Sequence, residues 1–189
     1  MRRYPETMRW LYLCLMLLAL TLVLPRQSQA DEARLDELFE ALKAADATSW
    51  EQIEDKIWTE WSRSGSPTMD LLLNRGRAAM GTENTDVAIE HLTALVENAP
   101  EFAEGWNARA TAYYAAGLVG PSIADIARTL ELEPRHFGAL SGLALILEKI
   151  GDQDAALEAY RAALAIHPQR PNLREAVERL ERELEGSAI

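Results

Sequence analysis

Residues 101–134 read EFAEGWNARATAYYAAGLVGPSIADIARTLELEP, and this stretch decides the fold because its pattern recurs on both sides of it. It ends at Pro134, and two further prolines stand 34 residues before and after that position. Three columns at this spacing hold similar residues: Leu72, Trp106 and Leu140; Gly76, Ala110 and Ala144; Ala88, Ser122 and Ala156. A fixed period of this length indicates a solenoid in which each unit is a hairpin of two α-helices.

The period divides the middle of the chain into three units, at residues 69–102, 103–136 and 137–170. Each unit is predicted to hold two helices of about 14 residues, separated by a loop where Gly, Pro or short polar residues interrupt the pattern. These loops are expected at 81–85, 117–121 and 151–152. The small residues of the second column are expected to let the two helices of a hairpin approach closely.

The segments beside the units have helical patterns but lack the repeated columns. Residues 31–68 are predicted to form a degenerate N-terminal helical hairpin that covers the leading edge of the solenoid. Residues 171–189 carry apolar residues on one face and alternating Arg and Glu on the other, which predicts a C-terminal capping helix and tail. The predicted fold class is therefore an all-α, right-handed α-solenoid of antiparallel helical hairpins.

The first 30 residues are predicted to be an export signal. Arginines precede an uncharged run at residues 10–24, and Ala30 ends a small-x-small sequence of the kind that signal peptidases cleave. The 15 residues of this run would rise only about 23 Å as a helix, less than the roughly 30 Å hydrocarbon core of a membrane. We therefore expect cleavage after Ala30. The alternative is that residues 10–24 are retained as a membrane anchor.

Composition excludes several classes of function. Because residues 1–30 hold four Arg and one Glu, residues 31–189 retain 15 basic and 29 acidic residues, a net charge of −14. This charge argues against binding of nucleic acid or of anionic membrane surfaces, which both require basic patches. The single cysteine, Cys14, lies within the predicted signal, so neither a disulfide nor a cysteine nucleophile is expected after cleavage.

The sequence contains no pattern typical of catalysis or of metal binding. His91, His136 and His167 lack metal-site spacing, and the last two fall near turns between units, where a solvated or capping role is expected. Neither a Gly-rich phosphate loop before a helix nor a serine-nucleophile motif is present. We predict that the protein is not an enzyme and has no metal or cofactor. The alternative is an enzyme or a metalloprotein that uses its histidines and carboxylates.

The second unit closely resembles a tetratricopeptide repeat (TPR). The residues that carry the resemblance are Trp106, Arg109, Ala110, Tyr113, Gly117, Ser122, Ile126, Thr129 and Pro134. The neighbouring units match in register, so the resemblance covers about 102 of the 189 residues. In layout the chain resembles the small exported TPR proteins of Gram-negative bacteria, in particular alphaproteobacteria, which implies a periplasmic location.

The resemblance implies a concave groove, lined by the first helices of the units and suited to an extended peptide or a partner helix. The positions that face the groove in TPR domains hold Leu73, Arg77, Met80, Asn107, Thr111, Tyr114, Ser141, Leu145 and Glu148. Gly138 and Gly142 leave the third unit without bulk there and make room for a bound segment. A carboxylate clamp of the kind that holds chaperone C-termini is not expected, because Leu73 and these two glycines stand where clamp residues belong.

Arginine replaces the usual leucine of the repeat at two positions, Arg75 and Arg109. In similar repeats such an arginine pairs with an aspartate in the second helix of its hairpin, which for Arg109 would be Asp125. The resemblance therefore implies an internal ion pair that fixes the geometry of the second hairpin. The equivalent position for Arg75 holds His91, so the sequence does not decide whether the first hairpin contains such a pair.

Trp50, Trp58 and Trp61 fall on roughly one side of the second predicted helix. They are expected to fill the core beneath the N-terminal hairpin. If part of this surface is exposed, it would form a second interface for docking or for a homo-oligomer.

These features predict a non-enzymatic periplasmic adaptor that binds a partner protein or peptide through its concave groove. One alternative is a membrane-tethered assembly factor or chaperone for a client in the cell envelope, similar to TPR subunits of cytochrome c maturation systems. Another is a structural oligomer built through the tryptophan surface.

Overall fold

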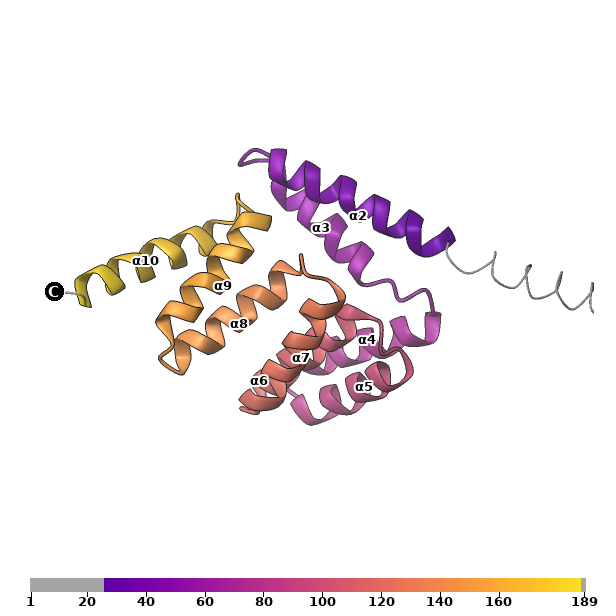
Figure 1. Cartoon of the computed structure of the whole chain (residues 1–189). Helices are drawn as coiled ribbons and strands as arrows, with labels where there is room; N and C mark the ends of the chain where they lie inside the picture. Colours follow the sequence, from indigo (N-terminus) through magenta and orange to yellow (C-terminus); the bar gives the residue numbers. More distant parts are fainter. Residues whose placement is uncertain (1–25, 188–189) are drawn as a thin grey trace, which may run out of the picture.

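The computed structural model describes residues 26–187, and within this range the chain folds into helices joined by short loops (Figure 1). In chain order the helices are α2 (Arg26–Ala44), α3 (Trp50–Trp61), α4 (Pro67–Gly81), α5 (Thr85–Asn98), α6 (Ala103–Ala115), α7 (Val119–Leu132), α8 (Phe137–Lys149), α9 (Gln153–Ile166) and α10 (Pro171–Ser187). No helix in this part of the chain has the length and apolar character that a membrane crossing requires. The predicted export signal lies outside the described residues except for residues 26–30, which begin α2.

The three predicted hairpins are α4–α5, α6–α7 and α8–α9, so the all-α solenoid is confirmed. The loop of the second hairpin is shorter than predicted, because Pro121 lies in the first turn of α7, where its missing backbone N–H costs no helical hydrogen bond. Gly117 and Gly151 take the left-handed backbone conformation, with φ of 77° and 88°, to end the first helix of their hairpins. The equivalent position of the first hairpin holds Glu83, with φ of 58°.

The column of small residues sets the spacing of the helices within a hairpin. A Cβ atom added to Gly76 in α4 would lie 2.5 Å from Cγ of Leu92 in α5. Leu92 is fully buried and packs with Leu95 of its own helix and Ala108 of α6, so it could not move without disturbing the next hairpin. The glycine therefore permits the close approach that the sequence pattern predicts.

The C-terminal helix α10 covers the apolar face that the last hairpin leaves open. Leu173, Val177 and Leu180 of α10 are buried against α9, in one cluster with Ala156 and Tyr160. The side chain of Arg161 on α9 pairs with Glu181 of α10 at 2.6 Å. This arrangement confirms the prediction of a capping helix.

The N-terminal hairpin, α2–α3, lies elsewhere than predicted. Its apolar side chains form a separate cluster with Phe137, the first residue of α8, rather than joining the cluster of the first repeat. The buried members of this cluster are Phe39, Leu42, Ile57, Trp61 and Phe137. Figure 1 shows α3 beside the start of α8 and the turn between α9 and α10. The prediction that the hairpin covers the leading edge of the solenoid is therefore wrong: it folds back over the second and third repeats.

Candidate binding groove

The first helices of the three hairpins, α4, α6 and α8, line a groove with two pockets. The tyrosine pocket has a volume of about 300 Å³. Its lining residues are Trp58, Asn107, Ala110, Thr111, Tyr114, Ser122, Ile126, Gly138, Ala139, Ser141, Gly142, Leu145, Ile146, Arg170 and Asn172. The arginine pocket has a volume of about 260 Å³. Its lining residues are Trp58, Arg77, Met80, Leu92, Glu104, Asn107, Ala108 and Thr111.

Seven of the nine predicted groove residues line these pockets. Tyr114, Ser141 and Leu145 lie at the tyrosine pocket, Arg77 and Met80 lie at the arginine pocket, and Asn107 and Thr111 line both. Leu145 is 52% exposed, so an apolar side chain is presented to solvent beside the tyrosine pocket. Five of the six groove positions of the second and third repeats thus come together at the tyrosine pocket.

The other two predicted groove residues lie outside both pockets. Leu73 is only 1% exposed, because it packs in the core of the first repeat, where Ala108 and Ala112 of α6 leave room for it. Glu148 accepts a hydrogen bond from the hydroxyl of Tyr160 and pairs with Arg179 of α10 at 2.9 Å. Leu73 is therefore a core residue, and Glu148 connects α8 to α9 and α10.

Trp58 of α3 stands between the two pockets and lines both of them. Its ring occupies the space left by Gly138: a Cβ atom on that residue would lie 2.7 Å from Cη2 of Trp58. The centre of its ring is 5.6 Å from that of Phe137 and 5.5 Å from that of His136, both in edge contact. The room predicted at Gly138 for a bound segment is thus filled by a side chain of this same protein, while Gly142 still lines the tyrosine pocket.

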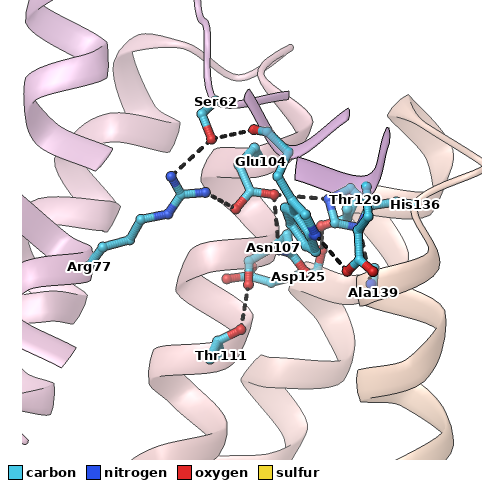
Figure 2. Close-up of polar contacts among 11 residues, drawn as sticks. Ser62, Arg77, Glu104, Asn107, Thr111, Asp125, Thr129, His136 and Ala139 are labelled. Carbon is cyan, nitrogen blue, oxygen red and sulfur yellow. Dashed lines mark hydrogen bonds and ion pairs between the residues drawn. The ribbon is translucent and has the colours of Figure 1, made fainter. Parts of the chain in front are cut away.

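A series of polar contacts holds the C-terminal end of α3 to the groove (Figure 2). Arg77 donates one hydrogen bond to the hydroxyl of Ser62 at 2.9 Å and another to Glu104 at 2.6 Å. The second carboxylate oxygen of Glu104 lies 2.9 Å from Nε2 of His136 and accepts a bond from Asn107 at 3.0 Å. Glu104 is only 3% exposed, so these partners compensate for the burial of its charge.

The ring of His136 is oriented by the helix that follows it. Its Nδ1 accepts a hydrogen bond from the backbone N–H of Ala139, which caps the start of α8. The proton of the neutral ring is therefore on Nε2, which donates to Glu104. His136 also stacks on Trp61 of α3, with 4.1 Å between ring centres. One buried side chain thus joins α3, α6 and α8.

A second polar cluster holds the middle of α3. Glu54 lies 2.9 Å from Nε2 of His167 and 3.3 Å from Arg170, and it accepts a hydrogen bond from the indole N–H of Trp58. Burial favours the neutral form of Glu54, but the hydrogen bonds from His167 and Trp58, together with the charge of Arg170, outweigh it and lower the pKa of Glu54. Glu54 is therefore held as a carboxylate between α3 and the turn that joins α9 to α10.

Neither cluster is marked by a recognisable pattern in the sequence. His136 and His167 were expected to be solvated or to cap helices; His136 does cap α8, but both side chains are fully buried. The three tryptophans of α3 lie on the side of the hairpin that faces the repeats, and the ring of Trp50 is in edge contact with His167. Among residues 26–187 no three His, Cys, Asp or Glu side chains are grouped so that they could hold a metal ion.

The ion pair implied for the second hairpin is present. Arg109 donates from Nε to Oδ2 of Asp125 at 2.7 Å and from Nη2 to Oδ1 at 2.9 Å, so the pair is bidentate. Its side chains are 13% and 6% exposed, and the guanidinium lies 5.0 Å from the ring centre of Trp106. This pair joins α6 to α7, and neither of its residues lines a pocket. Arg75 is exposed.

Gly138→Ala is expected to destabilise the protein, whereas Gly142→Ala, one turn further along α8, is not. The first change forces a methyl group against Trp58, and overpacking of this kind costs about 1–3 kcal/mol. The second places its methyl group at an ordinary 3.8 Å from Cδ1 of Ile126, and replacing a helical glycine gains up to about 1 kcal/mol. Urea unfolding followed by circular dichroism measures both variants. If the two variants change the free energy of unfolding equally, the close approach of Trp58 to residue 138 does not affect stability.

Comparison with known proteins agrees with the repeat pattern. The family model described as tetratricopeptide repeat matches residues 73–120 and 121–171. A TPR repeat-containing protein of Rhizobium etli is 37% identical over 161 residues, which cover 85% of this chain and 79% of that protein. The similarity therefore extends well beyond the three repeats.

Solved TPR domains have the same fold. The Sgt2 TPR domain of Aspergillus fumigatus is 26% identical, with a TM-score of 0.60 over 65% of this chain and 83% of that one. The first TPR domain of RPAP3, solved with the HSP90 peptide SRMEEVD, is 18% identical, with a TM-score of 0.60 over 64% and 95%. The TPR2B domain of yeast Sti1, solved with an Hsp70 peptide, is 20% identical, with a TM-score of 0.57 over 62% and 99%. The period of 34 residues, the three hairpins and these matches together show that the chain belongs to the tetratricopeptide repeat family.

Proposed function

We propose that the chain is a non-enzymatic adaptor of the bacterial periplasm that binds a partner protein, or a peptide segment of one, through the tyrosine pocket. The observation that carries the proposal is that this pocket stays open although α3 fills the adjoining part of the groove. Its buried lining includes the apolar side chains of Ala110, Ile126 and Ile146, and its more accessible lining includes the polar Thr111 and Ser141 together with the exposed Leu145. Pockets with this distribution suit the anchoring side chain of a peptide.

The comparisons support a role in protein binding. RPAP3 and Sti1 were solved with peptides bound to their TPR domains, and this chain has the same fold. Five of the six predicted groove positions of the second and third repeats also line the tyrosine pocket. A partner protein is therefore the class of ligand that fits both the fold and the pocket.

Photocrosslinking in the organism of origin tests this proposal. A photoreactive amino acid replaces Leu145, which lines the tyrosine pocket, and in a matched control it replaces Ile150, which is 58% exposed but lines neither pocket. A discrete adduct at position 145 that is absent at position 150 is expected. The proposal fails if position 145 gives no adduct, or gives only the adducts that position 150 gives.

The periplasmic location is supported by the sequence of residues 1–30, and we propose that this segment is removed after Ala30. Mass spectrometry of the protein isolated from its own cells is then expected to find Asp31 at the N-terminus. An N-terminus at Met1 would favour the alternative, in which residues 10–24 tether an assembly factor for an envelope client to the inner membrane. That outcome would change the location but leave the binding surface in place.

A further inference from the structure

The part of the groove beside the tyrosine pocket is covered by a helix that does not belong to the repeats. α3 lies against the start of α8 and the turn between α9 and α10 (Figure 1). The indole of Trp58 lines both the tyrosine pocket and the arginine pocket and so stands between them. α3 therefore occupies the groove in the manner of a bound helix, which is one of the ligands that apolar grooves take.

Two side chains of α3, one helical turn apart, make specific contacts with the third repeat and the turn after it. The carboxylate of Glu54 lies 2.9 Å from Nε2 of His167 and 3.3 Å from Nη1 of Arg170. Trp58 fills the space that the missing side chain of Gly138 leaves, and its indole N–H donates to Glu54 at 3.1 Å. Residues four apart lie on one face of a helix, so a carboxylate followed by an aromatic ring at this spacing is the feature that the surface receives.

The receiving surface is built without the N-terminal hairpin. His167 ends α9, Arg170 lies in the turn before α10, and Gly138 lies in the first turn of α8. In the part of the chain that the structure describes, the three apolar clusters of the repeats and α10 contain no residue of α2 or α3. The repeats therefore keep their own cores, and the receiving residues keep their supports, when α3 is absent.

The contact between the hairpin and the repeats leaves two buried hydrogen-bonding groups unpaired. They are the indole N–H of Trp61 and Nδ1 of His167, the buried side-chain atoms among residues 26–187 that have no hydrogen-bond partner. A buried polar atom without a partner costs free energy that water restores on exposure. The link at 62–66 includes Gly65, whose φ of 78° is in the left-handed region. Opening of this contact thus relieves two unmade hydrogen bonds and is hinged at a short, glycine-containing link.

We propose that the surface under α3 binds a helix of a partner protein that carries a carboxylate and, four residues later, a large aromatic side chain, and that α3 holds this site until the partner displaces it. The carboxylate of the partner pairs with His167 and Arg170, and its ring fills the notch at Gly138. Displacement of α3 also joins the two pockets into one longer groove. The inference goes beyond the proposed function, because the tyrosine pocket is open while α3 is docked.

A labelled peptide of residues 49–63, which spans α3, tests whether the site takes such a helix from another molecule. Fluorescence anisotropy compares its binding to the full-length chain, to Trp61→Ala, in which loss of a buried ring is expected to release the hairpin, and to Trp61→Phe, in which the hairpin is expected to stay docked. The peptide is expected to bind Trp61→Ala about tenfold tighter than the other two chains, because there the tethered α3 no longer competes. At saturating peptide, hydrogen exchange in α2 of the unaltered chain is expected to speed up.

Variants of the peptide test the recognised feature. Glu54→Gln and Asp55→Asn each remove one negative charge, but Glu54 contacts His167, whereas Asp55 is exposed on α3. Glu54→Gln and Trp58→Ala are each expected to weaken binding about tenfold, and Asp55→Asn is expected to leave it unchanged.

Three results would each overturn the inference: equal binding of the peptide to all three chains, equal binding of Glu54→Gln and Asp55→Asn, or an α2 that stays protected at saturating peptide. Circular dichroism checks that both chain variants are folded, and if Trp61→Ala is not, the exchange of α2 in the unaltered chain decides alone. None of these results affects the tyrosine pocket, which photocrosslinking at position 145 tests separately.

Discussion

Asp125→Ala is expected to lower the free energy of unfolding by about 3–5 kcal/mol, because it leaves the charge of Arg109 buried without its partner. Hydrogen bonding to Asp125, opposed by burial, raises the pKa of Arg109 in the unaltered chain. The variant lacks this bond, but an arginine stays protonated over the whole pH range in which proteins fold, so the guanidinium cannot escape the cost by losing its proton. Its other neighbours are the rings of Trp106 and Tyr113, 5.0 and 5.3 Å away, and the hydroxyl of Thr93 at 3.4 Å, none of which is an anion. Glu97 is the remaining carboxylate that acts on Arg109, and its effect is smaller than that of Asp125. Urea unfolding monitored by circular dichroism gives the change.

The matched control removes both charges. Arg109→Leu combined with Asp125→Ala places at position 109 the residue that TPR units usually have there. A pair of buried charges replaced by apolar side chains is often neutral in stability, so the double variant is expected to unfold within about 1 kcal/mol of the unaltered chain. The interpretation is contradicted if the double variant is as unstable as Asp125→Ala, since the loss would then not arise from an unpaired charge.

Trp61→Ala is expected to release the N-terminal hairpin from the repeats. The ring of Trp61 is 6% exposed, stacks on His136 and lies 5.0 Å from Phe137. Removing a buried tryptophan side chain costs about 3–5 kcal/mol, and here the cost falls on the contact between α3 and α8. Hydrogen exchange measured by mass spectrometry is expected to speed up in α2 and α3 while α4 and α5 stay protected.

Trp61→Phe is the control for this change. It keeps an aromatic ring in the cluster and removes the indole N–H, which has no hydrogen-bond partner among residues 26–187. We expect it to cost about 1 kcal/mol and to leave exchange in the hairpin slow. If Trp61→Ala instead accelerates exchange equally in all helices, the hairpin and the repeats unfold as one unit, and local release is excluded.

The parts of the structure that could be predicted from the sequence are those set by contacts within one repeat or between neighbours. The pair of Arg109 and Asp125 joins two helices of one hairpin, only 16 residues apart. Gly76 is explained by the helix it packs against within the same hairpin. A period of 34 residues specifies such contacts directly, because each repeat presents the same faces to the same neighbours.

The position of the N-terminal hairpin could not be predicted in this way. Glu54 and His167 are 113 residues apart, and Asp36 contacts Arg135 across 99 residues. Glu54 lies outside the repeats, so no column identifies its partner, and periodicity does not determine where a non-repeating segment docks. Leu73 was misplaced for a related reason: its column faces the groove in TPR domains, but the small side chains beside it in α6 allow it to be buried.

The docked hairpin also fixes the number of repeats that this protein can have. An open solenoid can lengthen by duplicating a unit, because each unit contacts only its neighbours. Here the C-terminal end of α3 packs through Trp61 on Phe137 of α8, and the five residues 62–66 join the same end to α4. A connection of that length spans at most about 17 Å, while one more hairpin between α4 and α8 would add two helix layers of about 8–10 Å each. A further hairpin between α4 and α8 is therefore expected to pull the N-terminal hairpin away from one of them, so the docked hairpin opposes lengthening of the repeat array.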